Sequence, residues 1–177
     1  MQEPFLFTLI VTGGIPVVVS YIHLYNMMSD PNIFNDANEL WGGLKDSTLY
    51  IWLFSVVLTI ASYFYLGYYF VWDATLESWH VHLLTVAYVL FFNFAGQYAG
   101  ISMLDLRLRS KTTYLQIVLY MVALACVLIT VVTVFLQDTW AIISSMMLLV
   151  HHLFFDAFYW YESFLAENFD IGRLLFP

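Results

Sequence analysis

Three ionisable side chains, His151, His152 and Asp156, lie inside the strongly apolar stretch LLVHHLFFDAFYWYE, which runs from Leu148 to Glu162. His152 and Asp156 are four residues apart, so on an α-helix they share one face and can form a hydrogen bond. Charged groups within a membrane are costly unless they are paired, hydrated or neutralised, and they usually face the interior of a helical bundle. The pair therefore either joins two helices, handles a ligand or a proton, or binds a metal or haem.

His151 is expected to lie apart from this pair. Adjacent residues of an α-helix are separated by about 100° around its axis, so the ring of His151 should point to a different neighbour. A metal or haem site is the weakest interpretation, because a metal needs three or four ligands and haem needs an axial pair. Of the other histidines, His80 and His82 are expected at the opposite end of the bundle, which leaves His23 as a further candidate ligand.

Two amide side chains, Asn93 and Gln97, form a second polar group, on the third apolar run of the chain. Consecutive spans with short loops are antiparallel, so these amides should lie at about the depth of the histidine pair. We expect a shared polar pocket, and hydrogen bonding between helices is the competing structural interpretation. The candidate ligand-binding residues are Asn93, Gln97, His151, His152, Asp156 and Tyr159.

The composition indicates that these groups are positioned by membrane helices. Of the 177 residues, 62% are hydrophobic and only 10% are charged, whereas a soluble domain has about 25% charged residues. The chain is therefore expected to be an integral membrane protein surrounded by lipid. With five Lys and Arg and a net charge of −8, it has no basic surface for nucleic acid.

Five apolar runs of 21 to 25 residues occupy residues 5–25, 49–72, 80–104, 113–136 and 140–160. Each run is long enough to cross about 30 Å of hydrocarbon as a helix, and in lipid the backbone must satisfy its own hydrogen bonds. The sequence therefore predicts one all-α domain over residues 1–177, a bundle of five transmembrane helices. A longer polar loop, residues 26–48, joins the first two helices.

The basic residues predict the orientation of this bundle. With five spans, every Lys and Arg falls in loops or a tail on one side of the membrane. The positive-inside rule makes that side cytoplasmic, with the C-terminus inside and the N-terminus outside. These residues are Lys45, Arg107, Arg109, Lys111 and Arg173.

Several local features accompany the five-span pattern. The first run contains Gly13-Gly14-Ile15-Pro16, the third contains Asn93, and the fifth opens with Asp138-Thr139-Trp140-Ala141. With these features the chain resembles the translocator protein family, the tryptophan-rich sensory proteins, although residues 26–48 lack the Trp-x-Pro-Pro element of that family. The resemblance implies a pocket between helices, beneath the first loop, that binds a porphyrin, haem, sterol or similar apolar molecule, often in a homodimer.

Three functions are compatible with these features. The leading interpretation is a small membrane protein that binds, transports or senses a hydrophobic ligand in an intramembrane pocket. The alternative is an accessory structural subunit of a larger membrane complex, and the third is a proton or ion pathway through Asp156 and the histidines. No nucleophile–base pair, phosphate-binding loop or paired-carboxylate motif is visible in the sequence, so an enzymatic function has little support.

Overall fold

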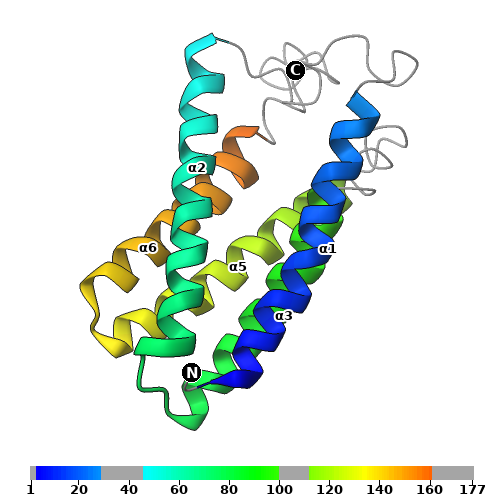
Figure 1. Cartoon of the computed structure of the whole chain (residues 1–177). Helices are drawn as coiled ribbons and strands as arrows, with labels where there is room; N and C mark the ends of the chain where they lie inside the picture. The colour runs from blue at the N-terminus through cyan, green and yellow to red at the C-terminus, as the bar shows by residue number, and fades with distance from the viewer. Residues whose placement is uncertain (1–2, 29–45, 100–111, 161–177) are drawn as a thin grey trace.

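Helices account for the regular structure of the described residues, 3–28, 46–99 and 112–160, in the computed structural model, and no strand occurs among them. The predicted all-α class is therefore confirmed for this part of the chain. The helices, shown in Figure 1, are α1 (Pro4–Met28), α2 (Asp46–Tyr68), η2 (Tyr69–Asp73), α3 (Ser78–Ala99), α5 (Thr112–Leu136), α6 (Thr139–Val150) and η3 (His151–Trp160). The segments η2 and η3 are π-helices that continue α2 and α6 directly.

Among the residues that the structure describes, four helices are long and apolar enough to cross a membrane. They cover Leu49–Asp73, Ser78–Ala95, Gln116–Leu136 and Thr139–Phe158. The corresponding stretch of α1, Pro4–Ser20, is shorter. The five basic residues on which the predicted orientation depends all lie outside the described part of the chain.

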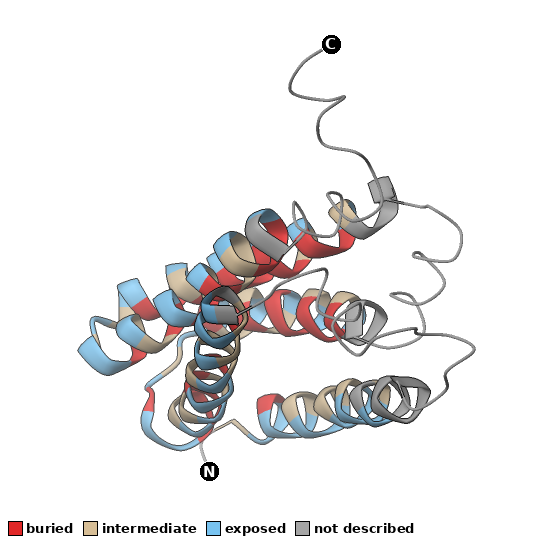
Figure 2. Cartoon of the chain, turned by 90° about the horizontal axis from the view of Figure 1, so that it is seen from above, coloured by how far each residue is buried: buried red, intermediate tan, exposed pale blue. Residues whose placement is uncertain are grey.

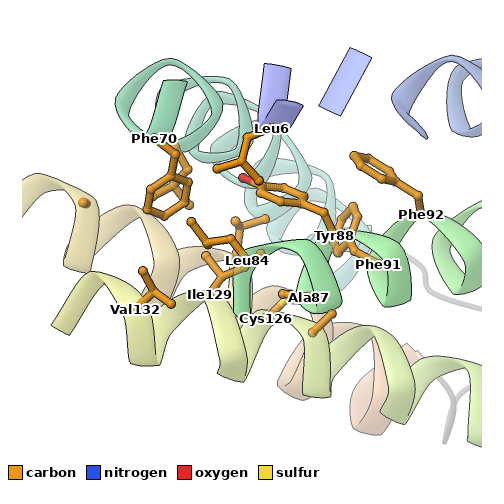
Figure 3. Close-up of a cluster of buried hydrophobic side chains, with 14 of the residues drawn as sticks. Leu6, Phe70, Leu84, Ala87, Tyr88, Phe91, Phe92, Cys126, Ile129 and Val132 are labelled. Carbon is orange, nitrogen blue, oxygen red and sulfur yellow. The ribbon is translucent and has the colours of Figure 1, made fainter. Parts of the chain in front are cut away.

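Helix α5 joins the two halves of the packing. It contacts α3, α6 and η3, whereas α1 packs on α3 and α2 packs on α6. Figure 1 shows α1 running alongside α3 and α2 crossing α6. The buried side chains between these helices are labelled in Figure 3 and include Leu6, Phe70, Leu84, Tyr88, Phe91, Phe92, Cys126 and Ile129.

A glycine allows the close approach of α1 and α3. A Cβ atom added at Gly13 would overlap the ring of Phe92, whereas one at Gly14 would meet only the hydroxyl of Tyr63, at 3.5 Å. The backbone of α1 continues as a helix through Pro16. The Gly-Gly-Ile-Pro segment therefore serves helix packing at Gly13.

Large apolar side chains cover the outside of the bundle. Phe54, Phe64, Phe135, Trp140 and Phe154 are all exposed, and Figure 2 shows exposed residues along the outer faces of the helices. Water would not solvate such a continuous apolar surface, and lipid would. The outer surface is thus compatible with a membrane protein.

Asp138 sets the start of the helix that carries the site. Its carboxylate accepts a hydrogen bond from the backbone N–H of Ala141 at 2.8 Å and caps α6. The preceding residue, Gln137, has a positive φ of 58° and closes the short turn from α5. A fixed N-terminus of α6 fixes in turn the depth at which His151 and Asp156 lie.

Candidate functional site

The fifth apolar run changes from an α-helix to a π-helix at His151, the first residue of η3. In a π-helix the backbone hydrogen bonds join residues five apart, so His151 and Asp156 lie on adjacent turns of one face. On an α-helix the same two residues would be separated by about 140° around the axis. The prediction that His151 points away from Asp156 is therefore wrong, because it assumed α-helical geometry throughout.

Both histidines contact one carboxylate oxygen. The Nδ1 atom of His152 lies 3.0 Å from Oδ2 of Asp156, and the Nε2 atom of His151 lies 3.5 Å from the same oxygen. One donor atom from each of the three residues lies within 4.8 Å of the other two. His151 and Asp156 are buried, and the side chain of His152 is 12% exposed. The predicted His152–Asp156 pair is confirmed, and His151 joins it.

Two side chains of α2 form hydrogen bonds to His151 and Asp156. The indole N–H of Trp52 donates to Oδ1 of Asp156 at 3.1 Å, and Oγ of Ser55 lies 2.9 Å from Nδ1 of His151. Trp52 and Ser55 are three residues apart, so they lie on neighbouring turns of one α2 face. Oδ1 of the Asp156 carboxylate thus accepts from α2, and Oδ2 contacts both histidines.

The sequence prediction missed Trp52 and Ser55, although a signal for them exists. Trp52 lies near the start of the second run and Asp156 near the end of the fifth. In an antiparallel bundle, the start of the second run and the end of the fifth lie on the same side of the membrane. Residues at equal depth there, such as Trp52 and Asp156, can therefore be expected to meet. Matching by depth with the third run alone, which carries the amides Asn93 and Gln97, does not find Trp52 and Ser55.

The hydrogen bonds of Ser55 determine the tautomer of His151. The single hydroxyl proton of Ser55 is donated to the backbone carbonyl of Trp52 at 2.7 Å, because a carbonyl oxygen can only accept. Oγ of Ser55 then accepts from Nδ1–H of His151. In the neutral ring the remaining nitrogen, Nε2, carries a lone pair, and it faces Oδ2 of Asp156.

Of the other predicted site residues, Asn93 is the one whose side chain the structure describes, and it does not join the cluster. Asn93 is exposed, and its amide donates to the carbonyl of Val89 in its own helix at 2.7 Å. The structure therefore does not bring Asn93 to the histidine pair. Instead α3 presents aromatic side chains to η3: the ring of Phe91 meets that of His152 edge-on, with centroids 5.4 Å apart. The side chains of Gln97 and Tyr159 lie outside the described set.

An apolar groove adjoins the cluster between α2 and the fifth run. The groove has a volume of about 370 Å³ and is open to the outside of the molecule. Its polar lining consists of Ser55 and His151, which lie next to each other, and methionine and aliphatic side chains form most of the rest. The lining residues are Ser55, Leu58, Ile142, Ile143, Met146, Met147, Val150, His151 and Phe155.

This arrangement can do two things chemically. The groove can take up an apolar chain and offer one polar group, at Ser55 and His151, to its end. The three converging donor atoms of His151, His152 and Asp156 can hold a cation, since imidazole nitrogen and carboxylate oxygen are common metal ligands.

Comparison of the chain with protein-family models, with curated proteins and with solved structures gives no match in any of the three.

Proposed function

We propose that this chain is a small integral membrane protein that binds a slender hydrophobic ligand in the groove between α2 and α6–η3. One observation carries the proposal: the groove is lined almost entirely by apolar side chains, and its two polar lining residues, Ser55 and His151, lie 2.9 Å apart. A ligand with a hydrocarbon body and a small polar end fits that distribution. The polar end would donate a hydrogen bond to Oγ of Ser55, which has one lone pair left after it accepts from Nδ1–H of His151.

The dimensions of the groove favour an acyl, isoprenoid or similar chain over a porphyrin. Small-molecule sites usually enclose about 300–1,000 Å³, and a groove of about 370 Å³ is near the lower limit. Met146 and Met147 supply flexible, polarisable walls that adapt to different apolar shapes. The wide, flat macrocycle of a porphyrin or haem would need a larger site, so the proposed ligand is a single apolar chain.

The proposed membrane arrangement has five spans, with α1 as the span additional to the four long apolar helices. The basic residues of the loops would put the C-terminus in the cytoplasm. The resemblance to translocator proteins supports the same general plan, an apolar ligand held between helices. Binding, rather than catalysis, is the proposed activity, and transport or sensing would be its consequence.

Photolabelling tests this proposal. The chain would be purified, reconstituted in lipid nanodiscs and irradiated with a diazirine-labelled fatty acid, and labelled residues would be mapped by mass spectrometry. We expect labels on α6 residues such as Met146 and competition by unlabelled chains whose polar end is an acid, alcohol or amine. The best competitor would identify the head group that the Ser55–His151 end recognises.

A matched pair of variants makes the experiment specific. Met146→Trp places a large ring in the groove and should abolish labelling. Val134→Trp adds the same ring at another exposed, apolar site and should leave labelling unchanged. Equal labelling in both variants would contradict the proposal.

A chain that is unstable when purified alone, and stable only with other subunits, would favour the accessory-subunit function instead.

A further inference from the structure

We infer that His151, His152 and Asp156 form a binding site for one zinc ion. The ion would lie between the three side chains, ligated by Nε2 of His151, Nδ1 of His152 and Oδ2 of Asp156. This inference is independent of the hydrophobic ligand, which would occupy the groove on the other side of His151. The segment η3 would then take part in two binding sites, one for the apolar ligand and one for zinc.

The spacing of the donor atoms suits zinc. Zinc binds imidazole nitrogen and carboxylate oxygen at about 2.0–2.2 Å in tetrahedral geometry, which places neighbouring ligand atoms about 3.4 Å apart. The two nitrogen-to-Oδ2 distances are 3.0 and 3.5 Å. The three residues offer donor atoms that lie within 4.8 Å of one another. Small rotations of the rings would therefore bring the distance between the two histidine nitrogens to about the same length.

A second shell is already in place around two of the three ligands. Metal-binding histidines almost always donate their other ring N–H to an acceptor, which fixes the ring and its tautomer. His151 does so, with Nδ1–H directed to Ser55 and Nε2 left for an ion. The carboxylate of Asp156 is held in the same way, since Trp52 occupies Oδ1 and leaves Oδ2 toward the histidines.

The tautomer of His151 also calls for a cation at this point. With its proton on Nδ1, the neutral ring directs the lone pair of Nε2 at the carboxylate oxygen 3.5 Å away. Two acceptors that face each other in a buried place repel, unless a positive charge lies between them. A zinc ion removes this repulsion, because it accepts a lone pair from each of the two facing atoms.

The donor set leaves one coordination position open. Three protein ligands plus one open position is the pattern of catalytic zinc sites, in which water or an exogenous donor completes the tetrahedron. The exogenous donor here would be water or a small anionic group.

Zinc content and affinity test the inference. The chain in nanodiscs would be stripped with a chelator, equilibrated with zinc and analysed by mass spectrometry of the metal. Co²⁺ would serve as the spectroscopic probe, because its absorbance reports tetrahedral ligation. We expect one zinc per chain and a tetrahedral Co²⁺ spectrum, both lost in His152→Ala and Asp156→Asn.

Controls separate ligation from general damage. His82→Ala and Asp73→Asn remove the same chemical groups at exposed sites away from the cluster and should retain zinc. Ser55→Ala keeps all three ligands and should weaken zinc binding by about 10- to 100-fold, so it decides the question even if Asp156→Asn does not fold. Met146→Trp should block the groove and leave zinc bound, which separates this site from the proposed ligand.

Three results would overturn the inference. One is a wild-type chain that binds no zinc above the level of His152→Ala. Another is unchanged zinc affinity in both Ser55→Ala and His152→Ala. Detection of a protonated His151 ring that persists in the presence of zinc would assign the position to a proton and would also overturn it.

Discussion

The indole N–H of Trp52 on α2 donates to Oδ1 of Asp156 on η3 across 3.1 Å, joining residues 104 positions apart in the chain. Both side chains are buried. The bond therefore ties the second apolar run to the fifth at the level of the histidines. It also orients the carboxylate on which the whole cluster depends.

Replacing Trp52 with Phe should destabilise the protein by about 1–3 kcal/mol, because a buried carboxylate oxygen loses its donor while the ring is largely kept. The measurement is the free energy of unfolding by denaturing detergent in mixed micelles. Trp79→Phe is the control: Trp79 donates to Glu77 at an exposed position, and its loss should change stability by less than about 0.5 kcal/mol. Equal effects of the two variants would show that the Trp52 bond contributes nothing specific.

Gly13→Ala should destabilise the packing of α1 on α3 by about 1–3 kcal/mol, because its new methyl group would overlap the ring of Phe92. Gly14→Ala is a matched comparison at the next residue, where the methyl group meets only Tyr63 Oη at 3.5 Å. Alanine is the better helix former, so this variant should be neutral or more stable by up to about 1 kcal/mol. Thermal unfolding in detergent measures both, and the reverse order would contradict the described packing of α1.

Thr133→Val should cost about 0.5–1.5 kcal/mol. Thr133 and Ser145 are fully buried, and their hydroxyls lie 2.8 Å apart between α5 and α6. Ser145 would keep its own bond to the carbonyl of Ile142, so no hydroxyl is left unpaired. Thr85→Val, which removes only a bond to the carbonyl of Val81 in the same helix, should change the unfolding free energy by less. A larger effect at Thr85 would count against the proposed link between α5 and α6.

Helices and the His152–Asp156 pair could be predicted because hydropathy and the i, i+4 spacing are local properties of the sequence. The position of His151 could not, since the change from α to π geometry at that residue depends on contacts with Ser55 and Asp156 in the folded bundle. No residue in the run HHLFF marks that change. The i, i+4 spacing therefore predicts the His152–Asp156 contact, but local spacing does not predict that His151 joins it.

The position of Asn93 could not be predicted from the sequence for a different reason. A polar side chain on a membrane helix can satisfy itself by donating to a carbonyl one turn back, and Asn93 does so to Val89. Its polarity then carries no information about which face of the helix is buried. The inner face of α3 is set instead by the bulk of Tyr88, Phe91 and Phe92, whose packing is a property of the whole core.

The convergence of both histidines on Asp156 is tested most directly by solid-state NMR of the chain in lipid bilayers. With ¹⁵N-labelled histidine and ¹³C-labelled aspartate, dipolar recoupling reports which imidazole nitrogens lie near the carboxyl carbon of Asp156. We predict cross-peaks from both Nε2 of His151 and Nδ1 of His152, and loss of both in Asp156→Asn. A cross-peak from His152 alone would contradict the π-helical geometry of η3 and the cation site that rests on it.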